Sequence, residues 1–499
     1  MLIYLISLLI LVILHYSFRK FSWMFLLSAS FAFYASIAGL RLLCTLLLLT
    51  IITYLFALLI EKITEEKKKL FILSSAILII LLPLIILKYS YFLTSNINLL
   101  FVYLRFNTVP IVTIPKDIET IYTIGLSFYT FQAISYLIDT YLEIVKPEKH
   151  LGYFSLYLSF FPKILQGPIE RADLLIPALK WTRPFKDQTQ NKISILTLND
   201  FIANARIAFL LIIWGAFKKF VIADRLGLFV DEFYSNHDSY KGIISLIPII
   251  FYSFQIYCDF SGYTDAALGI ARLFGIKLTD NFNSPYFATS VADFWRRWHI
   301  TLTKWLMDYI FRPISMSFRK NRLFAINFAI FITFLVCGIW HGPSWNFIVW
   351  GTLNGLYIIF SNFSKKRRDK LTTYLFPNSS PANKFVIQGI SLIFTFSLVS
   401  VTWIFFRSHS IEQALKIIIN IFDQPEIVPR LKQSSYDFFI AILGISSLLS
   451  FEILKQKGKT MELLFKRHLI VQWVSYSILL FAVIFLSIPS ETKFIYFEF

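Results

Sequence analysis

Long apolar runs alternate with short polar or basic loops along almost the whole chain. An α-helix rises about 1.5 Å per residue, so roughly 20 apolar residues cross a hydrocarbon core about 30 Å thick. The runs nearest this length are residues 2–18, 22–40, 42–60, 70–87, 123–141, 323–340, 383–406, 436–453 and 469–487. With shorter and broken segments added, the pattern predicts an all-α, polytopic membrane protein with about eleven to thirteen membrane helices.

Three segments depart from this simple alternation. Residues 91–104 are consistent with either a crossing or a re-entrant segment, and the pattern does not decide between them. An apolar run from Asn204 ends in Lys218 and Lys219, which predicts a helix end that faces the cytoplasm. The piece from Ile411 to Ile421 is amphipathic, which is typical of a helix that lies in the membrane interface.

Composition independently excludes a soluble enzyme. Of the 499 residues, 57% are hydrophobic and only 16% are charged. The chain has 48 Lys and Arg against 30 Asp and Glu, a net charge of +18. In a membrane protein such an excess lies mostly in cytoplasmic loops, so we do not expect a nucleic-acid-binding surface.

The basic loops also orient the chain. Basic clusters at 61–69, 365–370 and 455–467 alternate consistently with the apolar runs when both termini lie outside. The first run has no basic residue ahead of it and no small-residue cleavage pattern, so we expect an uncleaved first span. We therefore expect a multi-pass membrane protein with both termini outside.

The stretch from Ser290 to Trp345 contains two histidines, each among tryptophans. Ser290 followed three residues later by an aspartate is typical of a helix start, and Pro313 limits the other end. This predicts one helix of about five turns. On such a helix His299 faces inward, on the same side as Trp295, Leu302 and Leu306.

The second histidine stands at the end of an apolar run. Leu323 to Trp340 nearly spans a membrane, and Gly342 and Pro343 should break the backbone directly after His341. Within a membrane such a break is tolerated only where protein or a water-filled cavity surrounds it. An ionisable residue there is a functional candidate, although a packing histidine is the commoner case and His299 could equally be an interfacial anchor.

These residues resemble a known family. The blocks DFWRRWHITLTKWLMDYIF and GIWHGPSWNFIVWG resemble the two signature blocks of the membrane-bound O-acyltransferases, particularly the bacterial branch around the alginate O-acetyltransferase membrane subunit. The segments that also resemble family blocks are Thr123–Tyr141, Phe160–Arg171, Gln255–Ile276 and Trp403–Arg407. We therefore expect one domain over 1–499, in which 88–407 is the family core, 1–87 holds N-terminal spans and 408–499 holds the interfacial segment and two spans.

Polar residues inside two of these blocks are expected to face the protein interior, because they are costly in lipid. The first block carries Ser127, Tyr129, Gln132 and Asp139, and the following 160–171 segment predicts a re-entrant turn. In the third block, Asp259 or Asp265 could orient a histidine or line an acyl pocket beside Gln255, although satisfying neighbouring backbone is the commoner role.

The resemblance implies a ring of tilted helices around a central tunnel. The family's central histidine corresponds to His341 and its second histidine to His299. His341 would then be the general base, or a transient acyl carrier, because imidazole is the side chain whose ordinary pKa suits proton removal near pH 7. His299 would orient donor or acceptor, and Trp298, Trp340 and Trp345 would exclude water.

The expected substrates follow from the same resemblance. The donor would be acetyl-CoA or another acyl thioester, with no permanently bound cofactor and no metal. The acceptor would be a hydroxyl of a cell-surface or exported polysaccharide, reached directly or through a periplasmic hydrolase-like (SGNH) acetyltransferase partner. Transfer of D-alanine from a carrier protein to teichoic acid is the alternative within the enzymes. A transporter or lipid scramblase is the alternative of another class, against which the lack of an internal repeat weighs.

Overall fold

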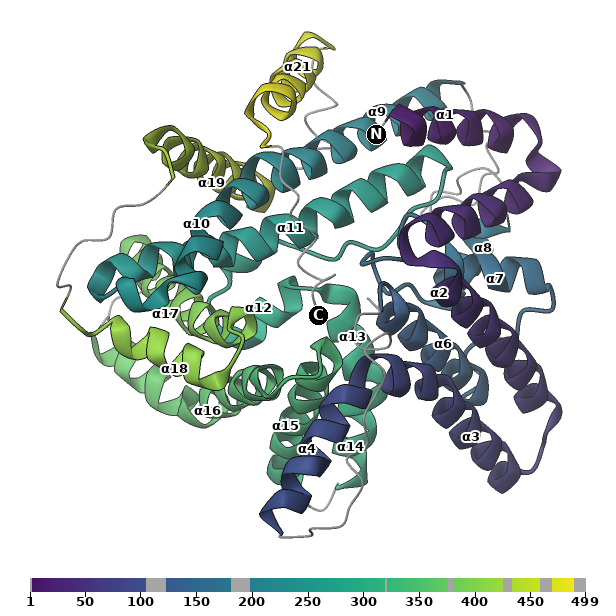
Figure 1. Ribbon diagram of the computed structural model, residues 1–499, viewed down its shortest axis with the longest axis horizontal. Helices are drawn as coiled ribbons and strands as arrows, with labels where there is room; N and C mark the ends of the chain where they lie inside the picture. The colour runs from purple at the N-terminus through teal and green to yellow at the C-terminus, as the bar shows by residue number, and fades with distance from the viewer. Residues whose placement is uncertain are drawn as a thin grey trace. The chain divides into compact units, whose positions relative to one another are not determined.

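The computed structural model describes residues 2–104, 123–180, 198–318, 321–375, 380–424, 433–457 and 469–488. Within these ranges the regular elements are all helical (Figure 1). Their contacts divide the described chain into two compact units. The first comprises residues 1–212 and 264–279, and the second comprises residues 213–263 and 280–488. We keep the single domain over 1–499 as a prediction.

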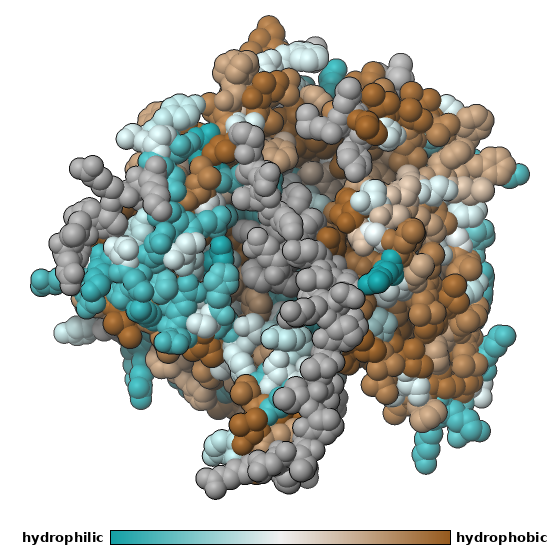
Figure 2. Space-filling view, in the orientation of Figure 1, coloured by the Kyte–Doolittle hydropathy of each residue, from teal (hydrophilic) through white to brown (hydrophobic). Residues whose placement is uncertain are grey.

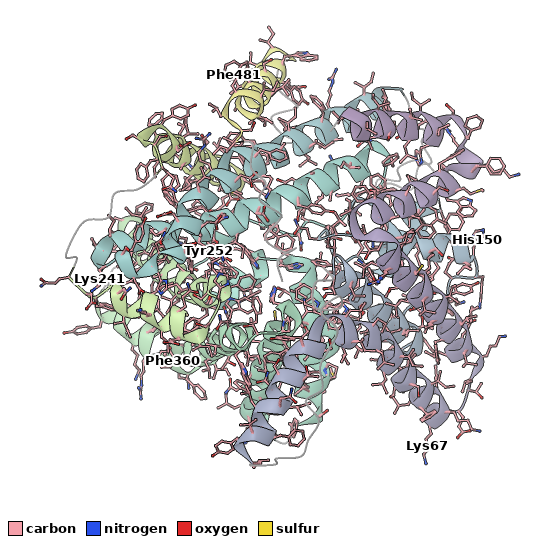
Figure 3. All side chains as sticks on the ribbon, viewed as in Figure 1. Lys67, His150, Lys241, Tyr252, Phe360 and Phe481 are labelled. Carbon is pink, nitrogen blue, oxygen red and sulfur yellow. The ribbon has the colours of Figure 1, made fainter. Side chains whose placement is uncertain are left out.

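The first unit is built around one long helix. Its helices are α1 (Leu2–Ser17), α2 (Ser22–Lys62), α3 (Glu66–Leu84), α4 (Ser90–Tyr103), α6 (Leu126–Tyr141), α7 (Leu151–Ser159), α8 (Ala172–Leu179) and most of α9 (Leu198–Ala216). Helix α2 packs against α1, α3, α6 and α7. Large hydrophobic side chains of α2 and α3 are exposed, and they form the brown surface over these helices in Figure 2. Lys67, in the first turn of α3, points away from the helices (Figure 3).

Two predicted boundaries in this unit are corrected. The expected spans 22–40 and 42–60 form a single helix with a kink at Gly39, whose φ of 80° a glycine adopts without steric cost. The fourth span, expected to end at 87, continues through Tyr103, because a π-helical turn, Ile85–Tyr89, joins α3 to α4. The segment that the sequence left open between a crossing and a re-entrant piece is thus part of one long helical stretch. Apolar periodicity locates such helices but does not reveal that neighbouring segments join.

The polar residues of α6 are buried, as predicted. Gln132 is 1% exposed and accepts a hydrogen bond from the ammonium group of Lys163, which is also buried. Lys163 belongs to the turn at 160–170, which the protein buries throughout. At the end of this turn the Glu170 carboxylate accepts hydrogen bonds from the backbone N–H of Thr279, at 2.5 Å, and from its hydroxyl, at 3.0 Å. The turn therefore has polar partners inside the protein.

The second unit contains the helices that carry both histidine blocks. They are α10 (Asp224–Ser235), the first part of α11 (Leu246–Leu273), α12 (Val291–Arg297), α13 (Ile300–Leu306), α14 (Arg312–Ser317), α15 (Arg322–His341), α16 (Trp345–Leu375), α17 (Pro381–Arg407), α18 (Ile411–Asn420), α19 (Ser435–Gln456) and α21 (Leu469–Leu486). Helix α16 has two distinct faces. Trp350 is fully buried, whereas Phe360 is 73% exposed and points outward (Figure 3).

Six helical stretches of the described chain are long and apolar enough to cross a membrane. They are Arg19–Lys62, Glu66–Tyr103, Gly242–Leu273, Arg322–His341, Pro381–Arg407 and Ser435–Gln456. Leu5–Ser17 and Ile470–Leu486 are shorter apolar helices. The protein is thus all-α and polytopic. The total of eleven to thirteen segments also counts shorter pieces and stays a prediction.

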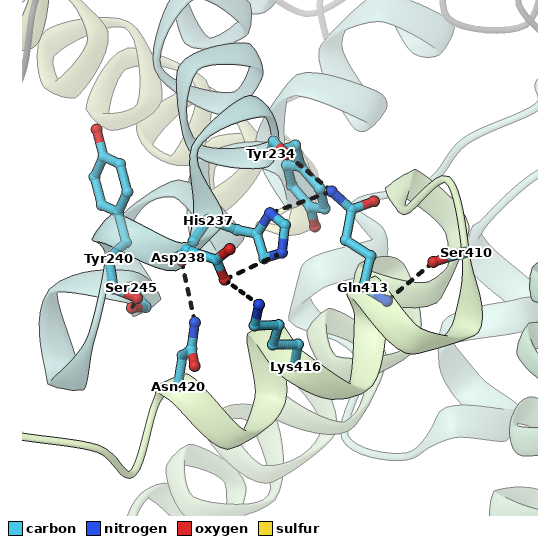
Figure 4. Close-up of polar contacts among 9 residues, drawn as sticks. All are labelled: Tyr234, His237, Asp238, Tyr240, Ser245, Ser410, Gln413, Lys416 and Asn420. Carbon is cyan, nitrogen blue, oxygen red and sulfur yellow. Dashed lines mark hydrogen bonds and ion pairs between the residues drawn. The ribbon is translucent and has the colours of Figure 1, made fainter.

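The amphipathic segment after α17 forms a helix, as predicted. In α18 the hydroxyl of Ser410 caps the first turn by accepting from the N–H of Gln413 at 3.1 Å. The polar side chains of α18 contact the end of α10, at Tyr234, and the short 3-10 helix His237–Ser239 that follows it (Figure 4). Lys416 pairs with Asp238 at 2.7 Å, and Asn420 donates to the carbonyl of His237 at 3.1 Å. Whether α18 lies in the membrane interface stays a prediction.

The predicted cytoplasmic helix end at Lys218 and Lys219 is wrong. Both lysines are buried within a continuous helical stretch, where the π-helical segment Phe217–Ala223 joins α9 to α10. The ammonium group of Lys219 lies 2.9 Å from Asp224 and 2.6 Å from Asp259. These carboxylates offset the cost of burying the charge, so the lysine does not have to end the helix.

Two glycines bring α15 and α16 into close contact. A β-carbon on Gly338 would lie 2.3 Å from the carbonyl oxygen of Phe347, and one on Gly351 would lie 2.3 Å from that of Phe334. Small residues allow such an approach between membrane helices. Gly338 precedes His341 by one turn, so this contact sets where the end of α15 lies against α16.

We predict that Gly351→Ala destabilises the protein by about 1–3 kcal/mol, because the added methyl group overlaps backbone that cannot yield. Thermal unfolding in detergent checks this. Gly389→Ala in α17 is the matched control, since a β-carbon there meets no atom within 4 Å. Equal unfolding temperatures for the two variants would contradict the close packing.

We further predict that Lys219→Met destabilises by about 3–5 kcal/mol, because Asp224 and Asp259 lose the cation that both contact. Adding Asp259→Asn to this variant should recover part of the lost stability. Lys366→Met, at an exposed position of α16, should leave the unfolding temperature unchanged. If the double variant unfolds at the same temperature as Lys219→Met, the unpaired carboxylates are not the cause of the lost stability.

Candidate functional site

The backbone breaks directly after His341, as predicted. Helix α15 ends at His341, Gly342 is extended, and α16 begins at Trp345. The N–H of Ser344 donates to the carbonyl of Gly342 at 3.0 Å, which shapes the short turn. His341 is only 5% exposed. The break therefore holds an imidazole inside the protein.

The single helix predicted from Ser290 to Pro313 is wrong. Ser290 does cap the first turn, accepting from the N–H of Asp293 at 3.1 Å. The helix stops at Arg297, and His299 has a φ of 42°, a left-handed conformation that is uncommon for a non-glycine residue. Helix α13 starts after it, and Pro313 lies in the first turn of α14 instead of ending a helix. His299 is fully buried, so its inward direction is confirmed.

Asn281 explains why the helix breaks at this point. Its backbone carbonyl accepts from the N–H of Ile300 at 2.9 Å. Its side-chain Oδ1 accepts from the N–H of Thr301 at 3.1 Å and lies 3.1 Å from Nδ1 of His299. These bonds supply partners for N–H groups that a continuous helix would satisfy internally. Periodicity does not detect a partner 18 residues earlier in the chain.

Burial also determines the protonation state of His299. It lowers the pKa of His299 to about 3, because the surrounding protein disfavours the charged imidazolium. The edge of its ring meets Phe260 of α11 at a centroid distance of 4.7 Å. His299 is therefore a neutral imidazole at physiological pH.

The two histidines contact the same tryptophan. The ring centroid of Trp340 lies 6.2 Å from that of His299 and 4.9 Å from that of His341. Trp340 is 5% exposed. The second unit thus brings together the two histidines that the sequence separates by 42 positions.

A series of aromatic contacts leads from His341 back to Trp298, the residue before His299. Beyond Trp340, His341 meets Trp350 at 4.8 Å, Trp350 meets Trp403 at 5.8 Å, and Trp403 meets Trp298 at 5.1 Å between ring centroids. Trp298 precedes His299 in the chain and is 1% exposed. Phe406 adds a contact to His341 at 5.1 Å. Helices α15, α16 and α17 and the α12–α13 turn all contribute, so the imidazole of His341 is enclosed by rings.

Trp345 is the first residue of α16 and is 52% exposed, more than the other tryptophans of the two histidine blocks. Its expected part in excluding water stays a prediction. Trp350 and Trp403 are buried among these rings, and sequence reasoning did not single them out. Trp403 lies in a segment that already resembled the family, which was the available signal. Trp350 follows Trp345 by five residues, and nothing in the sequence indicates which of them contacts His341.

The three other predicted side chains, Gln255, Asp259 and Asp265, all belong to α11. Asp259 pairs with Lys219, and the next residue, Phe260, touches His299. Gln255 is buried where α11 approaches Gly227 of α10. Asp265 belongs to the first unit. Among the described residues, no group of three or more His, Cys, Asp and Glu side chains is arranged to hold a metal ion.

Similarity to known proteins extends over most of this region. Residues 145–406 match the model of MBOAT, the membrane-bound O-acyltransferase family. The chain is 33% identical to the peptidoglycan O-acetyltransferase of Helicobacter pylori over 66% of its length and 60% of that protein. It is 31% identical to the probable alginate O-acetylase AlgI of Azotobacter vinelandii, over 60% of its length and 53% of that protein.

A teichoic acid D-alanyltransferase of Streptococcus thermophilus is 28% identical over 57% of this chain and 68% of its own length. The chain thus spans between half and two thirds of the length of the alginate and peptidoglycan relatives. The family model covers more than half of the 499 residues and includes both histidines. The protein belongs to the membrane-bound O-acyltransferase family.

Proposed function

We propose that this protein transfers an acetyl group from a cytoplasmic thioester, such as acetyl-CoA, to a hydroxyl of a cell-surface or exported polysaccharide. One observation carries the proposal. His341 is buried at a helix break, within an aromatic enclosure, and shares Trp340 with a second buried histidine. The alginate and peptidoglycan relatives, whose names give O-acetylation of polysaccharides, support the choice of acceptor.

His341 acts as the general base. A hydroxyl with a high pKa attacks a thioester poorly unless a base takes its proton in the transition state. The imidazole of His341 accepts this proton while the hydroxyl oxygen bonds to the acyl carbon. The carbon–sulfur bond then breaks, and the proton passes from the imidazolium to the departing thiolate. A short-lived acyl-imidazole at His341 is the other route to the same products.

The aromatic enclosure protects the reaction. Water competes with the sugar hydroxyl for the acyl group, and hydrolysis wastes the donor. Trp298, Trp340, Trp350 and Trp403 are all nearly or fully buried and surround the histidines with apolar rings. A substrate hydroxyl then reaches His341 in place of bulk water.

The membrane arrangement extends this proposal. The donor approaches from the cytoplasm and the acceptor from the opposite face, along a tunnel lined by the helices of the family core. The acyl group reaches the polysaccharide directly or through a periplasmic hydrolase-like acetyltransferase partner. The basic loops support an inner-membrane location with both termini outside.

D-alanyl transfer is a second candidate. The similarity to a teichoic acid D-alanyltransferase favours it, because that protein shares the family over 57% of this chain. The same base at His341 serves either acyl group, so the donor decides between the two. Acetyl-CoA supports the first function, and a D-alanyl-loaded carrier protein supports the second.

We predict that His341→Gln lowers acyl transfer by at least about a hundredfold, since general-base catalysis contributes roughly 10²–10⁴-fold. Membranes are supplied with labelled acetyl-CoA or labelled D-alanyl carrier, and label on surface glycan is counted. His15→Gln is the control, because His15 is as deeply buried, at 2% exposure, but belongs to α1 of the other unit.

Each result has a distinct meaning. Loss of label in His341→Gln, with the protein present at the control level, supports the transferase. Transfer at the control rate would remove His341 from the chemistry. Solute or lipid movement that persists in His341→Gln, in membranes that transfer no acyl group, would favour a transporter or scramblase.

A further inference from the structure

Asn281 lies at the centre of a hydrogen-bonded turn beside His299. It is 1% exposed, and its side-chain oxygen meets three groups. These are the backbone N–H of Thr301 at 3.1 Å, the hydroxyl of Thr301 at 2.9 Å and Nδ1 of His299 at 3.1 Å. A single carboxamide thus holds both the left-handed backbone at His299 and one nitrogen of its ring.

These contacts determine where the imidazole carries its proton. A backbone N–H only donates, so the atom of Asn281 that faces Thr301 is the oxygen and not the amide nitrogen. That oxygen only accepts, so the nearby Nδ1 of His299 has to carry a hydrogen. In a neutral imidazole the other nitrogen, Nε2, then has the lone pair.

We propose that Asn281 is a positioning residue that holds His299 as the neutral Nδ1–H tautomer, so that Nε2 accepts a hydrogen bond from a hydroxyl of the acyl acceptor next to the one that attacks. This inference rests on the proposed function and specifies the part of it that binds the acceptor. His299 then holds the sugar through one hydroxyl, while His341, whose ring meets the same Trp340, removes the proton of the neighbouring hydroxyl that attacks.

The chemistry of Nε2 restricts what His299 binds. A lone pair does not bind the carbonyl oxygen of a thioester, which is itself an acceptor. It binds an O–H or N–H group, and the substrates supply two: the hydroxyl of the acceptor and the amide N–H groups in the pantetheine arm of CoA. The pKa of about 3 agrees with this role, because His299 stays neutral and remains an acceptor at working pH.

The same turn also offers a donor. The amide nitrogen Nδ2 of Asn281 is buried, and no described residue accepts from it. One side of the carboxamide is therefore engaged with His299 and Thr301, and the other can donate to an oxygen of a bound molecule. A sugar, which carries several hydroxyl groups, matches a site with one acceptor and one donor nearby.

The kinetic test compares Asn281→Ala and Asn281→Asp. We expect Asn281→Ala to lower acyl transfer by roughly 10–100-fold, the size typical of removing a partner that orients a functional histidine. Asn281→Asp keeps the accepting oxygen and should retain most activity at alkaline pH. Its carboxylate raises the pKa of His299, so activity should fall at low pH, where wild type shows no loss from this group.

Asn420→Ala is the matched control, because Asn420 is a buried asparagine of α18 whose amide donates to the backbone carbonyl of His237 (Figure 4). It should transfer at the wild-type rate. In a His299→Ala background, Asn281→Ala should cause little further loss, since both changes remove the same interaction. Full additivity would show that Asn281 acts through the backbone alone and would overturn the proposal.

The Michaelis constants separate the two sources of the hydrogen-bond donor. A rise in KM for the polysaccharide acceptor in Asn281→Ala, with KM for acetyl-CoA unchanged, supports binding of the acceptor hydroxyl. A rise in KM for acetyl-CoA alone would assign His299 to the pantetheine arm and overturn the acceptor assignment.

A spectroscopic readout does not depend on activity. Nitrogen NMR of protein labelled with ¹⁵N-histidine distinguishes a protonated from an unprotonated Nε2, and His299→Gln identifies the signal. We expect an unprotonated Nε2 in wild type and a mixture of tautomers in Asn281→Ala. A protonated Nε2 in wild type overturns the inference even if the enzyme is active. The expected tautomer in a protein that transfers no acyl group would instead reject the proposed function alone.

Discussion

A backbone N–H or C=O group inside a membrane has no water to bind, so a helix can break only where another part of the protein supplies the partner. The same need for a partner holds wherever protein buries the backbone, and both histidines of this protein are buried at helix breaks. At His299 the partner is Asn281, whose carbonyl and carboxamide accept from Ile300 and Thr301. At His341 a short turn through Gly342 joins α15 to α16. Each break interrupts a regular array of side chains and leaves an imidazole within the protein.

The helices around these breaks are held by two kinds of contact. Gly338 and Gly351 let α15 and α16 approach until backbone meets backbone. Tryptophan and phenylalanine rings from α15, α16, α17 and the α12–α13 turn then fill the space around the histidines. Small residues and large rings are complementary here, because close packing of two helices leaves defined gaps that rings occupy without voids. Both imidazoles are buried within this packing.

Charged groups buried in the second unit also need partners inside the protein. Lys219 lies between Asp224 and Asp259, so the cost of removing each charge from water is offset by its neighbours. The pairing places Asp259 against the π-helical join of α9 and α10, and it places the adjacent Phe260 against His299. One turn of α11 thus links the buried ion pair to the wall of the histidine site.

The sequence alone determined the class of the protein and most of its helices. Apolar runs of membrane length require a helical, membrane-embedded chain, and Gly342 with Pro343 predicted the break at His341. Ser290 predicted a helix start, and the polar residues of α6 were correctly expected inside. Each of these follows from local rules, namely backbone sterics, capping and the cost of polar groups in lipid.

Tertiary structure decided what depends on a distant partner. The kink at Gly39 and the π-helical segments join apolar runs that hydropathy separates. Lys219, expected at a cytoplasmic helix end, is buried between two carboxylates instead. Asn281 broke the helix predicted through His299. Likewise, only packing shows that Trp350 is buried against His341, whereas Trp345 is half exposed. A residue's neighbours in space set these outcomes, and neither hydrophobic period nor residue type contains that information.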